Sequence, residues 1–345
     1  MPDYVLREIA KRGGEAHREA ALESLGISAT LRSARSQAEA GRAAIGPVRL
    51  ASAALRVPKV DRVIRNANGG TDLASTVVRR EGAPESGDPA IDEAFEHFGS
   101  TWTFFFEVLA RNSIDNAGMT LDGVVHYGNK FDNAFWDGDQ MVFGDGSNLL
   151  FTRLTQSLSV CAHELGHGVI QFDGPLVYQS QSGALNEHIA DAFGVMVHQW
   201  KHGQSSAEAD WLIGAEILAE GVSGTALRSM KEPGTAYDDD LLGKDPQPAH
   251  MDHYVDTADD NGGVHINSGI PNKAFYEIAM ALGGNSWDRA GRILYTTLGN
   301  PQLRPTSDFR RFARLNHRVA GQSYGAGSAE AAAVEAGWAA VGITV

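Results

Sequence analysis

The chain has 345 residues, of which 43% are hydrophobic and 21% charged, so it can bury a substantial core. Its net charge of −14 argues against nucleic acid or an anionic membrane as the main partner, and no apolar run is long enough to span a membrane. The single cysteine, Cys161, excludes an internal disulfide.

The first part of the chain differs from the rest in charge. Residues 1–59 carry 10 Lys/Arg and 6 Asp/Glu, a net charge of +4, whereas the remainder carries 19 and 37, a net charge of −18. Helical patterns cover 3–12, then 15–25 with Gly26 as a C-cap, then 28–44. A basic leader before an acidic body predicts two parts that attract each other.

The N-terminus also bears on localisation. It has no apolar segment of signal-peptide length, so we expect no export by the Sec route. The protein is expected to be made in the cytoplasm, and any release from the cell would use another route.

The body of the chain changes from strand patterns to helix patterns. Short β-prone runs at 76–78, 124–127 and 141–143 lie between turn signals and predict a twisted antiparallel sheet, interrupted by a helix over 88–113. From residue 149 onward helical patterns dominate, over 155–172, 182–202, 208–220, 268–282, 286–298, 306–319 and 327–341. This order predicts an α+β fold, with a β-rich part preceding a helical one.

The clearest chemical motif is His163-Glu-Leu-Gly-His167, which lies in a helix-compatible run. Residues four apart on a helix share a face, so the two imidazoles can bind one zinc ion, with Glu164 beside them as a general base. A catalytic zinc ion takes three protein ligands and a water molecule, and Glu187 on the next helical pattern is the candidate third ligand. Asp191, one turn further, would accept the spare N–H of a ligand histidine.

Other polar residues suit the same reaction. His265 follows a Gly-Gly turn and can donate to a developing oxyanion, with Asp260 close enough in sequence to orient it. Tyr178 offers a phenol for the same oxyanion. Asn133 and Ala134 lie on a strand-like edge that can pair with an extended peptide.

These motifs together resemble those of the thermolysin-family zinc endopeptidases. The matching segments are His163–His167, Gly183-Ala-Leu-Asn-Glu187-x-x-x-Asp191, Asn133-Ala-Phe-Trp136 with Gly144-Asp-Gly146, and Asp260-Asn-Gly-Gly-Val-His265-Ile-Asn-Ser268. The resemblance covers residues 60–345. It implies a thermolysin-like two-lobed fold, with a β-rich N-terminal lobe, an α-helical C-terminal lobe and the zinc site in the cleft between them.

The resemblance also assigns the reacting groups. It makes His163, His167 and Glu187 the ligands of one catalytic Zn²⁺ ion and Glu164 the general base. It makes His265 and Tyr178 the groups that bind the tetrahedral intermediate. The supporting residues would be Asp260 at His265, and Asp191 and Asn186 at the two ligand histidines.

For the substrate, the resemblance implies that Asn133 and Ala134 bind the peptide backbone and that Arg228 holds the carbonyl of the residue after the cut. The pocket for that residue would be formed by Phe151, Leu154, Val160, Ile213, Ile217 and Leu227. Since all of these are apolar, we expect cleavage on the N-terminal side of hydrophobic residues.

The leader has a resemblance of its own. Pro2-x-Tyr4-x-Leu6-Arg7-x-Ile9 is similar to the short pro-segment of the protealysin-like subgroup. This implies an inhibitory helical propeptide over 1–50 that the enzyme removes itself, with the junction between 40 and 55. The β-rich lobe, ending in the zinc-binding helix, would then be 51–172 and the helical lobe 173–345. We expect the protein to be a monomer. Its expected partners are peptide or protein substrates, the propeptide in cis and a proteinaceous inhibitor.

One departure from the family concerns calcium. At the positions of the family's double calcium site Asp210 alone keeps a carboxylate, and at another calcium position Thr225 replaces an aspartate. The replaced positions of the double site are Ser159, His198, Leu212 and Ala215. Because a hard cation needs several oxygen ligands, structural calcium is expected to be absent or weakly bound.

Two other functions would each need a sequence feature that this chain does not show. A catalytically silent thermolysin-like domain that only binds peptides or proteins would be expected to have lost a catalytic position, and no such loss is visible. An exopeptidase that trims N-termini would need an amine-binding acidic motif, which we do not find. The edge at Asn133-Ala-Phe-Trp136 favours internal cleavage.

Overall fold

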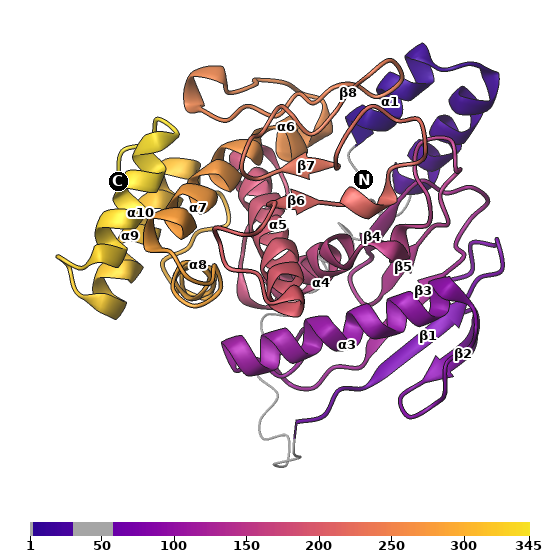
Figure 1. Cartoon of the computed structure of the whole chain (residues 1–345), viewed down its shortest axis with the longest axis horizontal. Helices are drawn as coiled ribbons and strands as arrows, with labels where there is room; N and C mark the ends of the chain where they lie inside the picture. The colour runs from indigo at the N-terminus through magenta and orange to yellow at the C-terminus, as the bar shows by residue number, and fades with distance from the viewer. Residues whose placement is uncertain (1–2, 30–57) are drawn as a thin grey trace. The chain divides into compact units, whose positions relative to one another are not determined.

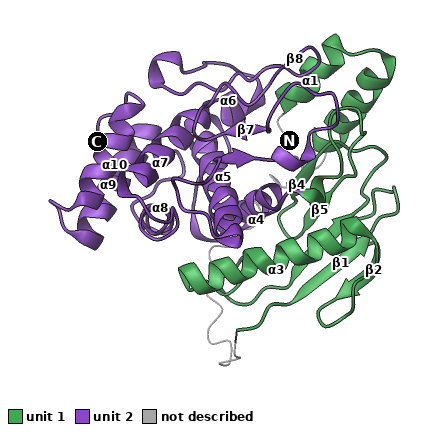
Figure 2. Cartoon of the chain, in the orientation of Figure 1, with its two compact units in different colours: residues 1, 3–156 green, residues 2, 157–345 purple. Residues whose placement is uncertain are grey.

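The computed structural model describes residues 3–29 and 58–345 (Figure 1). These residues form two compact units, unit 1 over Asp3–Gln156 and unit 2 over Ser157–Val345 (Figure 2). Within the described ranges, no helix combines the length and apolarity needed to cross a bilayer. The expected α+β class is confirmed, because unit 1 contains a sheet and unit 2 is mainly helical.

Unit 1 begins with two helices, α1 and a helix over 15–29, and continues into a sheet with one long helix. The bounds are α1 (Asp3–Arg12), β1 (Arg62–Asn66), β2 (Thr76–Arg80), α3 (Pro89–Leu109), β3 (Leu121–Val125), β4 (Ala134–Trp136) and β5 (Met141–Phe143), followed by a 3-10 helix (Leu154–Gln156). The predicted stop at Gly26 is wrong, since the helix continues through residue 29. The predicted helix over 28–44 lies largely outside the described residues.

The sheet has the order β2-β1-β3-β5-β4, and the predicted antiparallel arrangement is wrong. The three central strands β1, β3 and β5 are parallel, and only the outer strands β2 and β4 run antiparallel to their neighbours. Parallel neighbours need a long crossover connection, and α3 lies in the connection from β1 to β3. Strand β4, predicted as a strand-like edge, is indeed at one edge of the sheet.

Helix α3 covers one face of this sheet (Figure 1). It begins where Asp88 accepts a hydrogen bond from the Ala90 N–H and Pro89 occupies the first turn. It ends at Leu109, four residues before the predicted end, because Ala110 adopts a left-handed conformation with φ 54°. Its apolar side chains are buried, and Phe98 lies with its ring centroid 6.2 Å from that of Phe143 in β5.

A histidine between two carboxylates joins the start of α3 to the loop after β5. His126 Nδ1 lies 2.8 Å from Asp145 Oδ2, and His126 Nε2 lies 3.1 Å from Asp88 Oδ2. The hydrogen bond to Asp145 raises the pKa of His126 above its usual value, against the opposing effect of burial. Relative to the neutral form, the protonated imidazole is therefore more stable in the folded protein than in the unfolded chain.

We therefore expect a pH-dependent contribution to stability from His126. It should be fully present below the unfolded-state pKa of about 6.5 and be lost as the pH rises through the higher folded-state value. The difference in urea midpoint between the parent protein and His126→Gln should thus be larger at pH 6 than at pH 9. A pH-independent difference would contradict the assignment.

Unit 2 contains the remaining helices and two short hairpins. The bounds are α4 (Leu158–Asp173), α5 (Ser180–His202), β6 (Leu212–Ile213), β7 (Arg228–Ser229), β8 (Asp238–Asp239), β9 (Gly243–Lys244), α6 (Asp260–Asn267), α7 (Gly269–Leu282), α8 (Ala290–Leu298), α9 (Phe309–Tyr324) and α10 (Ala329–Ala340), with 3-10 helices at Ala215–Ile217 and Met251–His253. Most of the predicted helices are present. The predicted helix over 208–220 is wrong, because β6 pairs with β7 and Gly214 has φ 69°.

Candidate active site

Helices α4 and α5 carry the three predicted metal ligands, and they lie side by side in unit 2 (Figure 1). His163 and His167 project from one face of α4, with their ring centroids 4.7 Å apart. Glu187 on α5 faces them, with Oε2 3.5 Å from His163 Nε2 and Oε1 3.3 Å from His167 Nε2. One ligand atom from each residue lies within 4.8 Å of the other two, and all three residues are buried.

This arrangement fits a zinc ion. Bonds of about 2.0–2.1 Å to a tetrahedral zinc ion place neighbouring ligand atoms about 3.3 Å apart, close to the separations observed. Glu187 Oε2 is buried, and no donor among the described residues gives it a hydrogen bond, so this oxygen is available to a cation. Two imidazoles and one carboxylate are also the ligand types that a catalytic zinc site uses.

The electrostatics of the site agree with the ligand chemistry. Burial raises the pKa of Glu187, but the neighbouring His265, His167 and His163 lower it by more, so that it lies well below its usual range. The carboxylate is therefore ionised, as a metal ligand must be. Glu164, the predicted base, is buried beside the ligands, with Oε1 4.0 Å from His163 Nε2.

Each ligand histidine has a partner at its other ring nitrogen. His163 Nδ1 lies 2.8 Å from Asp191 Oδ1, and His167 Nδ1 lies 2.8 Å from Asn186 Oδ1. These contacts orient the rings so that Nε2 faces the ligand cluster. Asp191 also accepts hydrogen bonds from Arg228, at 2.9 Å from Nε and 2.6 Å from Nη2.

Sequence reasoning missed two contributors to this network. Asn272 on α7 donates to Asp191 Oδ2 at 2.9 Å, and its Oδ1 lies 2.8 Å from His188 Nδ1. His188 thus supports His163 through two intermediate side chains, Asn272 and Asp191. Nothing local marks Asn272, because it lies 81 residues from Asp191 in the chain.

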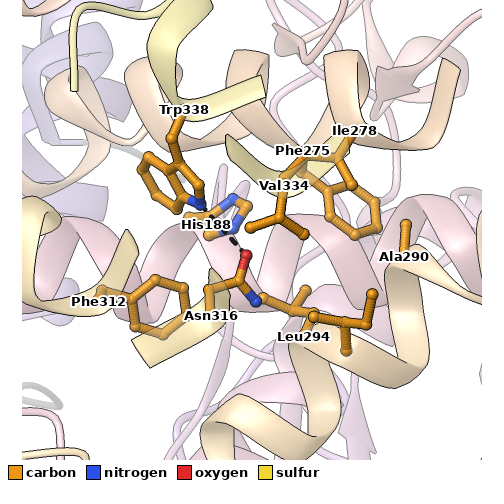
Figure 3. Close-up of a pocket in the computed structure, with 10 residues that line it drawn as sticks. His188, Phe275, Ile278, Ala290, Leu294, Phe312, Asn316, Val334 and Trp338 are labelled. Carbon is orange, nitrogen blue, oxygen red and sulfur yellow. Dashed lines mark hydrogen bonds between the residues drawn. The ribbon is translucent and has the colours of Figure 1, made fainter. Parts of the chain in front are cut away.

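His188 is enclosed in the core of unit 2 (Figure 3). Burial lowers its pKa to about 4, so the imidazole is neutral at physiological pH. Beside it lies a cavity of about 10 Å³, lined by apolar side chains that include Phe275, Phe312 and Trp338, with Asn316 receiving the indole N–H at 3.2 Å. This volume corresponds to about one water molecule, so the cavity is a packing gap and no ligand pocket.

The two predicted oxyanion-binding groups lie next to Glu187. His265 Nε2 is 3.2 Å from the Tyr178 hydroxyl and 3.6 Å from Glu187 Oε2, and the Tyr178 hydroxyl donates to Glu187 Oε1. Asp260 holds His265 twice, with Oδ1 2.6 Å from Nδ1 and Oδ2 accepting the backbone N–H at 2.8 Å. Burial lowers the pKa of His265, but Glu187 and Asp260 raise it by more, which favours the imidazolium as a donor.

The segment that precedes His265 has an unusual backbone conformation. Asp260, Asn261, Gly262 and Gly263 all have positive φ, between 50° and 81°, so a left-handed stretch precedes the helical turn that carries the histidine. Gly183 on α5 permits the close approach of this segment, because a Cβ there would lie 2.4 Å from Val264 Cγ1.

The β6–β7 hairpin gathers several of the residues predicted to contact substrate. Ile213 pairs with Arg228, and the Leu227 N–H donates to the Ile213 carbonyl at 2.9 Å. A Cβ on Gly214 would contact both Leu227 and Val160, so these two side chains flank the same point of the hairpin. Of the other predicted pocket residues, Ile217 of unit 2 and Phe151 and Leu154 of unit 1 are buried.

In unit 1, the leader lies on the edge predicted to bind substrate. Asn133 Nδ2 donates to the Ser28 hydroxyl at 2.9 Å, and the Asp132 N–H donates to the Ser24 hydroxyl at 3.1 Å. Ile27 packs against the apolar cluster of Val124, Tyr127, Phe131 and Val142. Ala134, the first residue of β4, is buried. The 15–29 helix therefore occupies the side chain of Asn133, one of the residues predicted to bind substrate.

Comparisons with known proteins agree with this geometry. The model of the thermolysin metallopeptidase catalytic domain matches residues 65–171, and that of the thermolysin metallopeptidase alpha-helical domain matches residues 174–343. The chain is 51% identical to an extracellular metalloprotease of Pectobacterium carotovorum subsp. carotovorum, over 83% of this chain and 82% of that protein. It is 36% identical to a thermolysin of Alicyclobacillus acidocaldarius subsp. acidocaldarius, over 74% of this chain and 46% of that protein.

A solved structure extends the similarity to the leader. The precursor of protealysin, a metalloproteinase from Serratia proteamaculans, aligns with a TM-score of 0.89 and 44% identity, covering 100% of this chain and 99% of that one. The zinc-binding geometry, the two matched domains and this precursor together show that the chain belongs to the thermolysin family of zinc metalloendopeptidases and resembles its protealysin-like members.

Proposed function

We propose that this endopeptidase cleaves peptide bonds on the N-terminal side of hydrophobic residues, and that it is made as a zymogen which removes its own leader. The observation that carries the proposal is the convergence of His163, His167 and Glu187 beside three further polar groups, Glu164, His265 and Tyr178, within one unit. The division into a propeptide over 1–50 and lobes over 51–172 and 173–345 stays a prediction.

The proposed reaction divides the work among these groups. Zinc held by His163, His167 and Glu187 would polarise the scissile carbonyl and acidify a water molecule. Glu164 takes the proton of that water and passes it to the leaving amine. His265 and Tyr178 donate hydrogen bonds to the oxygen that becomes negative, and both are already within reach of the ligand Glu187.

Support for the proposed specificity comes from the hairpin of unit 2. Val160, Ile213 and Leu227 gather around Gly214, so an apolar side chain of the substrate would meet apolar walls there. Arg228 directs two of its donors to Asp191, and its guanidinium is the group we assign to the substrate carbonyl.

The zymogen proposal draws on the leader contacts in unit 1. The hydroxyls of Ser24 and Ser28 accept hydrogen bonds from the Asp132 N–H and from Asn133 Nδ2. A substrate peptide cannot bind to these two donors while the leader is in place. The predicted junction between residues 40 and 55 falls outside the described part of the chain. A proteinaceous inhibitor, a monomeric state and release by a route other than Sec remain proposals as well.

We also propose that the enzyme does not depend on calcium. At Ser159, one of the positions that the resemblance assigns to calcium, Oγ accepts the Gly214 N–H at 3.0 Å and lies 3.0 Å from Ser157 Oγ. His198 Nε2 lies 3.6 Å from Glu216 Oε1. These positions thus offer the Ser159 hydroxyl and a His198–Glu216 pair, whereas a hard cation needs several oxygen ligands.

The proposed specificity is tested with a peptide that is acetylated at one end and amidated at the other. The wild-type enzyme should cut it internally, and mass spectrometry should locate the new N-terminus at a hydrophobic residue. Release of only terminal residues from an unblocked version would indicate an exopeptidase. Binding of the blocked peptide without cleavage would favour the catalytically silent alternative.

His265→Ala should lower kcat for the blocked peptide by about 10²–10³, the usual cost of one oxyanion donor, with a much smaller change in KM. Zinc content should stay at one ion per chain, because His265 is not among the converging ligand atoms. His253→Ala is a suitable control, since this histidine is exposed in a 3-10 helix of the same unit. Loss of zinc from His265→Ala would contradict the assigned role.

A further inference from the structure

A basic hollow lies at the start of α9 and in the loop before it, at the C-terminal end of unit 2 (yellow in Figure 1). It measures about 310 Å³ and is lined by Gln302, Arg304, Ser307, Arg311, Arg314, Leu315 and Arg318. Among the lining residues, the four arginines are exposed, whereas Ser307 and Leu315 are buried. No group assigned to catalysis lies in this hollow.

The charge of the hollow is opposite to that of the protein. The chain carries a net charge of −14, yet residues 304–318 contain five arginines and a single acidic residue, Asp308. Asp308 caps α9 by accepting the Arg311 N–H at 2.7 Å, and its other oxygen lies 4.0 Å from Arg311 Nε. Within the described part of the chain, Arg304 and Arg314 have no carboxylate partner.

The spacing of these arginines costs helix stability. Arg311, Arg314 and Arg318 are three and four residues apart, so their charges lie along one face of α9. Like charges at these spacings destabilise a helix unless an anion neutralises them. In an acidic protein, this arrangement is therefore better explained by an external anionic ligand than by the stability of the fold.

The wall of the hollow is hydrogen-bonded to the segment that carries Tyr178. The Val177 N–H donates to the Pro305 carbonyl at 2.9 Å, next to Arg304. The Phe309 N–H, at the start of α9, donates to Gln181 Oε1 at 2.9 Å, in the first turn of α5. A ligand in the hollow would thus bind to a part of unit 2 that is directly connected to the active-site segment.

The geometry favours an extended acidic peptide over a single small anion. Arg311 and Arg318 are seven residues apart, which is about 10 Å along a helix. An extended peptide repeats its side chains on one face about every 6.6–6.8 Å, so two or three carboxylates can reach the row of arginines. Guanidinium groups bind carboxylates through paired hydrogen bonds. One phosphate ion would reach only part of this row.

We propose that the hollow is an exosite that binds an acidic stretch of the protein substrate, outside the residues that flank the cleaved bond. This proposal rests on the endopeptidase function and adds a substrate class to it. The expected substrates carry a run of acidic residues on the same chain as the hydrophobic cleavage site.

Direct binding tests the hollow without any turnover. The probe is a fluorescein-labelled hexapeptide of alternating glutamate and glycine, added at low salt to the full chain carrying Glu164→Gln and followed by fluorescence anisotropy. Arg314→Glu combined with Arg318→Glu should weaken binding by about tenfold or more, because two ion pairs become repulsive contacts. The matched control combines Arg310→Glu with Arg292→Glu, which changes the net charge equally at exposed arginines outside the hollow.

Two results would overturn the proposal at this stage. Equal weakening by the control pair would show general electrostatic attraction without a site. Binding of inorganic phosphate with an affinity equal to that of the peptide, and lost in the same variant, would indicate a small-anion site. Thermal unfolding of each variant verifies that the fold is retained.

Kinetics then separate the exosite from the active site. Two blocked peptides share one cleavage sequence, and one of them carries a tail of acidic residues. The variant with Arg314→Glu and Arg318→Glu should raise KM for the acidic peptide alone and leave kcat and KM for the neutral peptide unchanged. An equal KM for both peptides in the wild type would refute the exosite, whereas failure of the wild type to cut either peptide would refute the proposed function.

Discussion

Glu164→Gln is expected to bind one zinc ion per chain, to lose at least about 10²–10⁴-fold in turnover and to keep its leader. The ligand set does not include this carboxylate, which lies 4.0 Å from His163 Nε2, so its amide replacement leaves the three metal-binding atoms in place. Without the base, the proton of the attacking water has no acceptor. Elemental analysis measures the zinc, and intact mass follows the leader.

The wild-type protein shows whether loss of the leader depends on Glu164. Purified wild-type protein should lose about 5 kDa on incubation, the mass of some fifty residues, while the variant stays whole. Glu335→Gln, at an exposed position on α10, should behave as wild type. If Glu164→Gln removes its leader in pure form, self-processing by this site is wrong. If the wild type also stays intact although it holds zinc, another protease is needed for activation.

The second large effect concerns stability. Arg228→Ala should lower the free energy of unfolding by about 3–5 kcal/mol, the usual cost of leaving one member of a buried ion pair without its partner. Asp191 and Arg228 are both buried, and the guanidinium provides two hydrogen bonds to the carboxylate. Of the polar contacts that the described residues make to this carboxylate, those of His163 and Asn272 would remain.

Urea unfolding in the Glu164→Gln background, with and without a zinc chelator, measures this effect. A double-mutant cycle with Asp191→Asn should show strong coupling, because the amide no longer needs a cation beside it. Asp191→Asn alone should weaken zinc binding by about 10–100-fold, since it changes the partner of His163. A loss below about 1 kcal/mol for Arg228→Ala would place the pair with ordinary surface ion pairs and refute the assignment.

The side chains that the sequence predicted as metal ligands do lie together, because their spacing is mostly local. His163 and His167 lie on one helix at a fixed spacing, and Glu187 and Asp191 repeat that regularity on the next helix. Helical periodicity alone is thus sufficient to place these four side chains on two facing surfaces. Only the packing of α4 against α5 had to be supplied by the fold.

Features that depend on contacts between distant parts of the chain could not be predicted from local sequence patterns. Strand direction in the sheet follows from the crossover through α3, and no residue within β1 or β3 records it. Residues 208–220 have a helix-like apolar spacing, but pairing with residues 228–229 takes precedence over it. The hydrogen bond between Asn272 and Asp191 joins residues 81 positions apart, and that between Asp132 and Ser24 joins residues 108 positions apart.

The left-handed stretch before His265 has a consequence for the tolerance of this protein to substitution. A Cβ on Gly262 would lie 2.6 Å from the Ser180 hydroxyl oxygen, and one on Gly263 would lie 2.7 Å from Asn267 Nδ2. Both glycines also have positive φ, so any side chain there meets backbone strain as well as a neighbouring atom. In a saturation-mutagenesis library, these two positions should therefore be as intolerant as the reacting residues, although neither presents a functional group to the substrate.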